Sequence, residues 1–242
     1  MLKPLDLKLQ KSTTDFSLSK NLKIDQEKNG YRFSMDPFLL CSEIPCLKKK
    51  TILDIGCGSG VISLVLKSKN PHIKVYGVEI QKELADIAVK NVLKNSMEHD
   101  ITIICNDIKN INPTDLNGKI DIIVSNPPYK KQKSGRICPD RQKAIAKHEI
   151  MLNIEDFFIC CKRLLQNSGK VYLIFPAERI SDILINMEKN NIKPALIKFI
   201  YTKKKQNAKL VFVSGIKNRS QQPLIAPPLI IDQLGKTRIN KS

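Results

Sequence analysis

From residue 51 onward the chain alternates two patterns of apolar positions. Short, nearly continuous apolar segments predict strands at 51–55, 73–78, 101–105, 120–125 and 170–175. Between them, apolar residues recur every three or four positions, which predicts helices at 60–69, 81–95, 149–166 (ending at a Gly169 cap) and 177–190. Two further strands, 195–202 and 209–215, are joined by a link too short for a crossover and must pair antiparallel. The expected fold class is therefore α/β, with a mainly parallel sheet of seven strands.

The two ends of the chain follow other patterns. Residues 5–33 alternate polar and apolar positions around a turn at 28–30, which predicts a small β-hairpin region. Residues 36–41 predict a short helix with Pro37 in its first turn. Three prolines in the C-terminal residues favour irregular structure there. We therefore expect an N-terminal extension, one domain and an irregular tail, at 1–50, 51–218 and 219–242.

A glycine-rich turn, Asp54 to Gly60, joins the first predicted strand to the first predicted helix. Strand, glycine turn and helix form the layout of a nucleotide-type cofactor site, and Gly56, Gly58 and Gly60 allow the backbone to approach a ligand closely. Their spacing differs from the Gly-x-Gly-x-x-Gly of NAD-binding turns. We expect Asp54 at the mouth of the turn, where an acid suits a ligand with a cationic end, such as S-adenosylmethionine.

Two acidic residues end the next two predicted strands. Glu79 lies 19 residues after Gly60, where a carboxylate can accept both hydroxyls of a ribose. Asp107 ends the following strand and could accept a hydrogen bond from an adenine amino group. Solvated acids at strand ends are the alternative, but together the two describe an adenosine site beside the glycine turn.

The fourth strand ends in Asn126, Pro127, Pro128 and Tyr129. Two prolines fix the backbone and remove two N–H donors, which leaves the Asn126 side-chain oxygen and the Pro127 carbonyl as acceptors. Two acceptors that converge on an exocyclic amino group would orient it and favour positive charge on its nitrogen. Tyr129 offers a face on which a planar base can stack. We expect these four residues to be catalytic; a rigid Pro-Pro turn is the alternative.

The net charge of +18, from 41 Lys and Arg against 23 Asp and Glu, indicates a polyanionic partner, with RNA or DNA first. Codon bias is an alternative source of lysine, because the chain is also rich in Ile and Asn. A basic stretch over 130–147 is expected to be a loop whose cations contact phosphates near the target: Lys130, Lys131, Lys133, Arg136, Arg141 and Lys143. A second group lies in a segment without acids, where solvated faces are the simpler interpretation: Lys198, Lys203, Lys204, Lys205, Lys209 and Lys217.

Other features narrow the cellular setting. Seven cysteines without a Cys-x-x-Cys pair, and first residues without a long apolar run, favour reduced thiols in the cytoplasm. The sequence contains no run of about 18 uncharged apolar residues, so no membrane span is predicted. The three histidines are scattered, so no metal site is expected. We expect a monomer.

These motifs together resemble those of class I S-adenosylmethionine-dependent methyltransferases acting on amino nitrogens. The resemblance covers roughly residues 30–215. It implies a seven-stranded Rossmann-like fold with the last strand antiparallel and S-adenosylmethionine as cofactor. Residues 31–40 resemble the pre-motif element of the tRNA1(Val) adenine-N6 methyltransferase family, Phe-x-x-Asp-x-x-Leu-Leu, which helps close the cofactor site and implies contacts from Phe33 and Asp36. Residues 136–149 resemble the basic insert of the same family.

The resemblance implies a tRNA substrate, methylated at N6 of an adenine in the anticodon loop. A protein glutamine-N5 methyltransferase shares the Asn-Pro-Pro-Tyr motif, but such enzymes usually carry an N-terminal helical bundle that residues 5–33 do not supply. A ribosomal RNA guanine-N2 methyltransferase is a further alternative of the same chemistry. A non-catalytic RNA-binding factor with the same fold is an alternative of another class.

Overall fold

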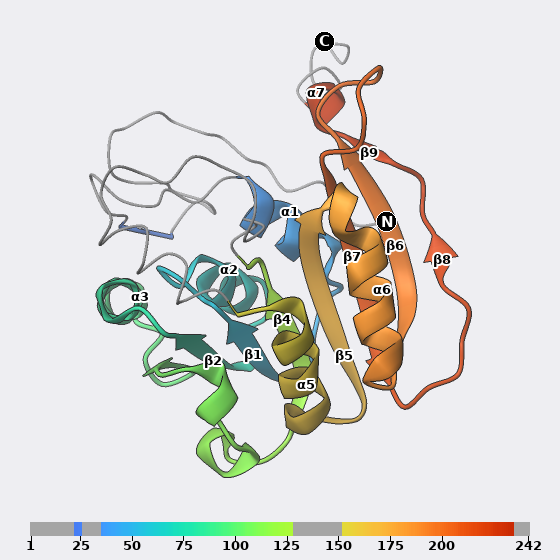
Figure 1. The fold of residues 1–242 in the computed structure, drawn as a ribbon. Coiled ribbons are helices and arrows are strands. Elements are labelled where there is room, and N and C mark those ends of the chain that lie inside the picture. The colour runs from blue at the N-terminus through green and yellow to red at the C-terminus, as the bar shows by residue number, and fades with distance from the viewer. Residues whose placement is uncertain (1–21, 26–34, 128–151, 235–242) are drawn as a thin grey trace, which may run out of the picture.

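The computed structural model describes residues 22–25, 35–127 and 152–234, which form one sheet with helices on both faces (Figure 1). The strand order is β3-β2-β1-β4-β5-β7-β6-β8, and β9 also pairs with β6. The strands are β1 Thr51–Ile55, β2 Lys74–Glu79, β3 Ile101–Cys105, β4 Ile120–Ser125, β5 Leu165–Pro176, β6 Ile192–Tyr201, β7 Leu210–Lys217, β8 Leu224–Ile225 and β9 Leu229–Ile230.

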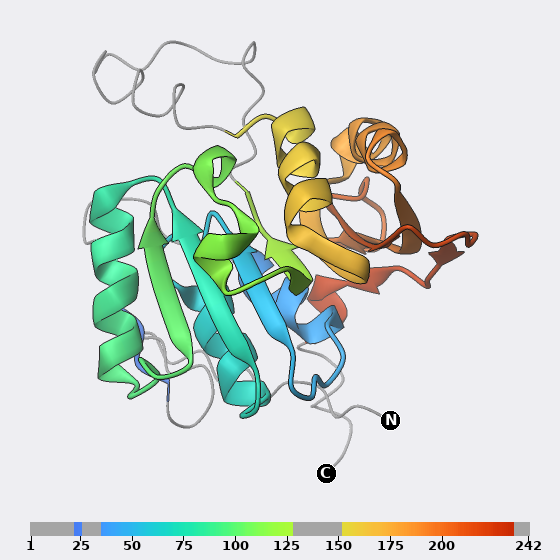
Figure 2. The same ribbon diagram turned by 90° about the horizontal axis from the view of Figure 1, so that it is seen from below.

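The helices divide between the two faces of the sheet, as the view from below shows (Figure 2). They are α1 Asp36–Glu43, α2 Val61–Lys69, α3 Lys82–Lys94, α5 Ile154–Leu164, α6 Ile180–Lys189 and α7 Ile231–Leu234, with short 3₁₀ turns η1 Ile108–Asn110, η2 Pro113–Leu116 and η3 Ala177–Arg179. Helices α1, α2 and α3 share one apolar core with the sheet, while α5, α6 and η1 share the other. Alternate strand residues supply the two cores, as the period of a strand requires.

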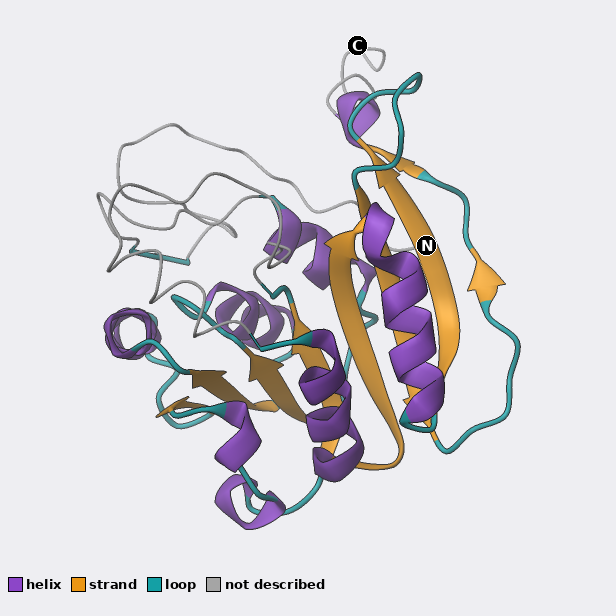
Figure 3. Cartoon of the chain, viewed as in Figure 1, coloured by secondary structure: helices purple, strands orange, loops and turns teal. Residues whose placement is uncertain are grey.

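The pairing directions agree with the sequence prediction. Strands β1 to β5 pair parallel with one another, while β7 pairs antiparallel with both β5 and β6. The mostly parallel α/β class is confirmed, although the described residues form nine strands rather than the expected seven (Figure 3).

The C-terminal tail, which was expected to be irregular, supplies the two additional strands, each only two residues long. Strands β8 and β9 both pair parallel with β6, and α7 follows. Pro223, Pro227 and Pro228 flank these two-residue strands. Proline is tolerated at a sheet edge, because the missing N–H there need not reach a neighbouring strand.

The predicted helix over 149–166 was too long. Within the described residues it begins at Ile154, because the Asn153 side chain accepts a hydrogen bond from the Asp156 N–H at 2.7 Å and caps the first turn. The chain becomes extended at Leu165, where β5 starts. Gly169 therefore lies within a strand and caps no helix.

The N-terminal part is described only in pieces. Helix α1 confirms the prediction and continues to Glu43. Residues 22–25 form neither helix nor strand, and 5–21 and 26–33 of the predicted β-hairpin region, with its turn at 28–30, lie outside the described residues. No helix in the described ranges is long and apolar enough to cross a membrane.

Candidate active site

The direction of strand order reverses at β1, which lies between β2 and β4. In open parallel sheets, ligands bind beyond the carboxyl ends of the strands at such a reversal. A pocket opens there, between the ends of β1, β2, β3 and β4. Its lining comprises Ile55, Gly56, Val78, Glu79, Ile80, Gln81, Asn106, Asp107, Ile108, Lys109, Ser125, Pro127 and Leu152.

The glycine-rich turn is held by hydrogen bonds at nearly every residue. The N–H groups of Gly56 and Cys57 donate to the Val78 carbonyl at 2.8 and 3.1 Å. The Gly58 N–H donates to Glu79 Oε2 at 2.9 Å. Gly60 caps α2 with φ at 82°, a backbone conformation that a side chain would disfavour. The turn is therefore held in shape by the protein itself.

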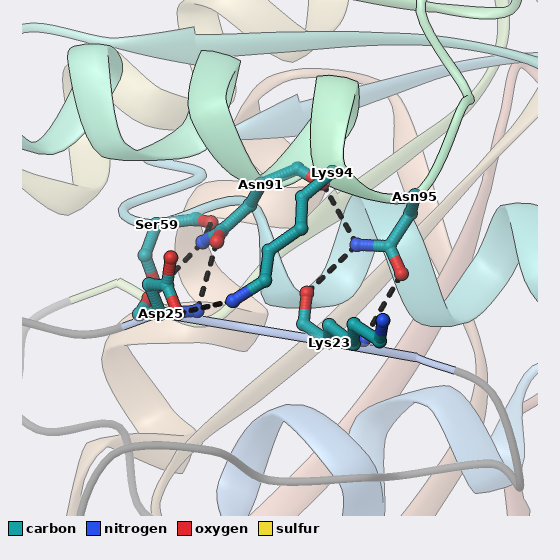
Figure 4. Close-up of polar contacts among 6 residues, drawn as sticks. All are labelled: Lys23, Asp25, Ser59, Asn91, Lys94 and Asn95. Carbon is teal, nitrogen blue, oxygen red and sulfur yellow. Dashed lines mark hydrogen bonds and ion pairs between the residues drawn. The ribbon is translucent and has the colours of Figure 1, made fainter.

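Asn91 of α3 adds a further hold on this turn (Figure 4). Its buried side chain donates from Nδ2 to the Ser59 carbonyl at 2.9 Å and to the Asp25 carbonyl at 3.1 Å. Its Oδ1 accepts from the Asp25 N–H at 2.8 Å. Asn95, one helical turn later, binds the backbone N–H and carbonyl of Lys23 in the same two-sided manner. One asparagine thus connects the N-terminal segment to the glycine-rich turn.

Glu79 and Asp107 lie where the sequence predicted, at the ends of β2 and β3. Glu79 is buried, with Oε2 bound by Gly58 and Oε1 accepting from the Gln81 N–H at 2.9 Å. Each carboxylate oxygen keeps a second lone pair for a ligand hydroxyl. Asp107 accepts from the Lys109 N–H at 2.9 Å and caps η1, which fixes its carboxyl group at the pocket.

Asp54 lies deeper than the sequence suggested, so its expected place at the mouth of the turn was wrong. It is fully buried on β1, and Oδ2 accepts from the backbone N–H and hydroxyl of Ser63 on α2, at 3.2 and 2.7 Å. Its Oδ1 has no hydrogen-bond partner within the described part of the chain. Burial raises the pKa of Asp54 to about 7, against the opposing effect of the Ser63 bonds.

The apolar walls of the pocket were not among the residues that the sequence motifs predicted. Ile80 and Ile108 each follow directly after a predicted strand-end acid, and Leu152 precedes α5. Ile108 is buried, whereas Ile80 is 40% exposed and offers a face to a ligand. The detectable signal was an apolar residue immediately after Glu79 and Asp107, a position at which a strand has already ended.

Asn126 and Pro127 follow β4, which lies on the other side of β1 from β2 and β3, and Pro127 lines the pocket. Ser125 is buried before them, and its hydroxyl donates to the Ile55 carbonyl at 2.7 Å, which ties the end of β4 to the end of β1. Asp36 begins α1 and is partly buried. The remaining predicted site residues lie outside the described residues: Phe33, Pro128, Tyr129, Lys130, Lys131, Lys133, Arg136, Arg141 and Lys143.

Comparison with known proteins identifies relatives. A family model described as methyltransferase small domain matches residues 35–180. A tRNA1(Val) (adenine(37)-N6)-methyltransferase of Porphyromonas gingivalis is 35% identical over 176 residues, which cover 70% of this chain and 68% of the relative. A protein of the same name from Aeromonas hydrophila is 31% identical and covers 68% of each chain.

Solved structures show the same fold at lower identity. A predicted O-methyltransferase from Agrobacterium tumefaciens has a TM-score of 0.64 at 18% identity, covering 81% of this chain and 87% of its own. Geranyl diphosphate C-methyltransferase of Streptomyces coelicolor, crystallised with S-adenosyl-L-homocysteine, has a TM-score of 0.53 at 12% identity and covers 75% and 74%.

Proposed function

The chain belongs to the methyltransferase small domain family, and we propose that it methylates N6 of an adenine in a tRNA anticodon loop with S-adenosylmethionine as donor. The observation that carries the proposal is that Asn126 and Pro127 directly follow β4, with Pro127 lining the same pocket as Glu79 and Asp107. The relatives named tRNA1(Val) (adenine(37)-N6)-methyltransferase support tRNA as the substrate class and adenine as the target.

The pocket residues fit the donor. S-adenosylmethionine supplies an electrophilic methyl group on a sulfonium. Glu79 would accept its ribose hydroxyls, and Asp107 its adenine amino group, with Ile80 and Ile108 against the ring. The buried, unsatisfied Oδ1 of Asp54 suits the cationic end of such a ligand, because an unpaired buried acceptor gains from a donor or positive charge nearby.

The target amino group, which accepts the methyl group, must be oriented toward the donor, but it does not need a strong base. The Asn126 side-chain oxygen and the Pro127 carbonyl would accept the two N–H groups of the target amine and direct its nitrogen lone pair toward the donor. Both acceptors also stabilise the positive charge that develops on nitrogen. The proton leaves for water after transfer. The Ser125 to Ile55 bond keeps these acceptors in register with the glycine turn.

A base inside the anticodon loop must turn out of its stack to reach this site, and Tyr129 is expected to stack on it. We further propose that the enzyme acts as a monomer in the cytoplasm and without a metal ion. Gel filtration tests the monomer, and assay in the presence of a chelator tests the independence from metal.

The test is to incubate the protein with labelled S-adenosylmethionine and bulk tRNA and to digest the product to nucleosides. Label in N6-methyladenosine is expected; label in N2-methylguanosine, or only in added protein, would replace the proposal by one of the alternatives. Asn126→Ala should abolish transfer while S-adenosylmethionine still binds with near wild-type affinity by calorimetry. Asn186→Ala on α6, away from the pocket, is the matched control and should keep full activity. Turnover by Asn126→Ala would remove the role assigned to this side chain.

A further inference from the structure

The connection between β6 and β7 concentrates positive charge at its surface. This segment, Thr202–Lys209, is called the basic hairpin here. It carries Lys203, Lys204, Lys205 and Lys209, all of them exposed. The chain contains no Asp or Glu between Glu188 and Asp232, so no acid close in sequence offsets these charges.

Two other lysines of the same acid-free segment serve the fold. Lys198 forms an ion pair with Glu43 of α1. Lys217 is buried and donates to the Leu165 carbonyl at 2.7 Å, at the end of α5. The four lysines of the basic hairpin, in contrast, have no ion pair with any residue of the described ranges. Their charge is therefore available to a partner.

Topology brings the basic hairpin to the edge of the sheet that holds the active site. Strand β6 pairs antiparallel with β7, and β7 antiparallel with β5, so β6 runs in the same direction as β4 and β5. The hairpin follows the carboxyl end of β6, as Asn126 follows that of β4; Figure 1 shows it in orange beyond the ends of β6 and β7. Three strand spacings separate β4 from β6, about 14 Å in all.

The base of the hairpin is anchored at both ends. The Ala177 N–H donates to the Lys209 carbonyl at 3.1 Å, and the Lys209 N–H donates to the Ile200 carbonyl at 2.9 Å. The Asp232 N–H of α7 donates to the Thr202 carbonyl at 3.2 Å. The C-terminal strands and α7 thus support the hairpin, so its lysines extend from a fixed base.

We propose that the basic hairpin binds the phosphate backbone of the tRNA while the target adenine occupies the site at Asn126. This inference rests on the proposed function for the identity of the RNA. A stem-loop that places one base at the end of β4 must lay its backbone over the neighbouring strand ends. Contacts to phosphates there require positive charge but no specific surface shape, and exposed lysines supply that charge.

The structure offers a control for bulk charge. Lys48, Lys49 and Lys119 are also exposed, but they precede β1 and β4 and so lie at the opposite, amino edge of the sheet. Lys203→Gln/Lys204→Gln/Lys205→Gln and Lys48→Gln/Lys49→Gln/Lys119→Gln therefore change the net charge equally. The two triple variants differ in whether the charge is removed at the carboxyl edge or at the amino edge of the sheet.

The experiment measures binding of wild type and both triple variants to bulk tRNA by fluorescence anisotropy over about 0.05 to 0.5 M salt, with S-adenosylmethionine affinity measured in parallel. Each single-strand phosphate contact contributes about 0.7 to the slope of log affinity against log salt, so the hairpin variant should lose about 2. If the electrostatic contribution of the three lysines vanishes near 1 M salt, the tRNA affinity of the hairpin variant at about 0.15 M salt should be about 50-fold below that of wild type. The amino-edge variant should match wild type, and both variants should bind S-adenosylmethionine normally.

Equal losses in the two variants, or no loss in the hairpin variant, would overturn the proposal, because the charge would then act in bulk or not at all. Methylation assays on the same proteins separate this result from the proposed function. A wild-type protein that binds tRNA through the hairpin but forms no N6-methyladenosine would refute the function and leave the hairpin as an RNA-binding element.

Discussion

Replacing Asn91 by alanine tests how far the glycine-rich turn depends on one side chain. The change removes three hydrogen bonds, to the Ser59 carbonyl and to the N–H and carbonyl of Asp25. Asn91 is fully buried, so the partners it leaves behind lie partly out of reach of water. Alanine is a good helix former, and α3 itself should therefore remain intact.

The magnitude follows from these bonds. A protein hydrogen bond contributes about 1 kcal/mol net, and a buried partner left unsatisfied costs about 1–3 kcal/mol. Three lost bonds with partial access of water therefore give a loss of about 2–4 kcal/mol in the free energy of unfolding. Asn95→Ala is the matched control: its two bonds to Lys23 are exposed and can be replaced by water, and its third, to the Asn91 carbonyl, lies within the last turn of α3. Its cost should stay below about 1 kcal/mol.

Urea unfolding of the two variants and wild type gives the comparison, and calorimetry gives the affinity for S-adenosylmethionine. Asn91→Ala should also bind the donor more weakly, because Ser59 belongs to the turn, whereas Asn95→Ala should bind it as wild type does. Equal stabilities for the two variants would refute the argument that Asn91 connects the N-terminal segment to the turn. A destabilised Asn91→Ala with unchanged donor affinity would confine its role to packing.

Two further changes probe the same region. Because burial raises the pKa of Asp54 to about 7, the folded state holds a proton that the unfolded carboxyl releases near pH 4. The stability this gives is complete below about pH 4 and is lost as pH rises to about 7, by up to about 4 kcal/mol. Urea unfolding of wild type should show this fall relative to Asp54→Asn, and parallel pH profiles would contradict it. In Gly77→Ala, the new Cβ would lie 2.8 Å from Ile103 Cδ1 and 2.9 Å from Cys57 Sγ. We expect Gly77→Ala to lower the free energy of unfolding by about 1–3 kcal/mol, and the double variant Gly77→Ala/Cys57→Ala to recover part of that loss. If the double variant recovers none of it, Cys57 is not the source of the clash.

The sequence predicted the parallel core of the fold well, because each buried strand there is a compact apolar segment with a polar residue at its end. Glu79, Asp107 and Asn126 could be assigned to one edge from the sequence alone, since each ends or follows a strand of the parallel sheet. The basic hairpin was also visible as a run of lysines. Its significance was not, because the edge at which it lies depends on the direction of β6, which only the pairing with β7 determines.

The rest could not be predicted, for identifiable physical reasons. Asp54 stands beside the glycine turn in the sequence, yet strand alternation directs it under α2, where Ser63 meets it nine residues later. Asn91 and Asn95 are polar residues near the end of a predicted helix, and the apolar periodicity that predicts the helix says nothing about them. Their partners, 66 and 72 residues earlier, have no signature of their own in the sequence. The tail formed strands despite its prolines, because an edge position makes smaller demands on backbone donors.

The attachment of residues 22–25 to α3 also orders events during synthesis. The segment leaves the ribosome before α3, because the asparagines that hold it are made 66 and 72 residues later. At about 5–20 residues per second, that interval lasts about 3–14 s. Throughout it, the apolar side chains of Leu22 and Ile24, buried in the finished protein, have no completed surface to cover them. Residues 22–25 thus precede β1 in the sequence but can pack only once α3 has been made, whereas the bond from Asn91 to the Ser59 carbonyl does not depend on them.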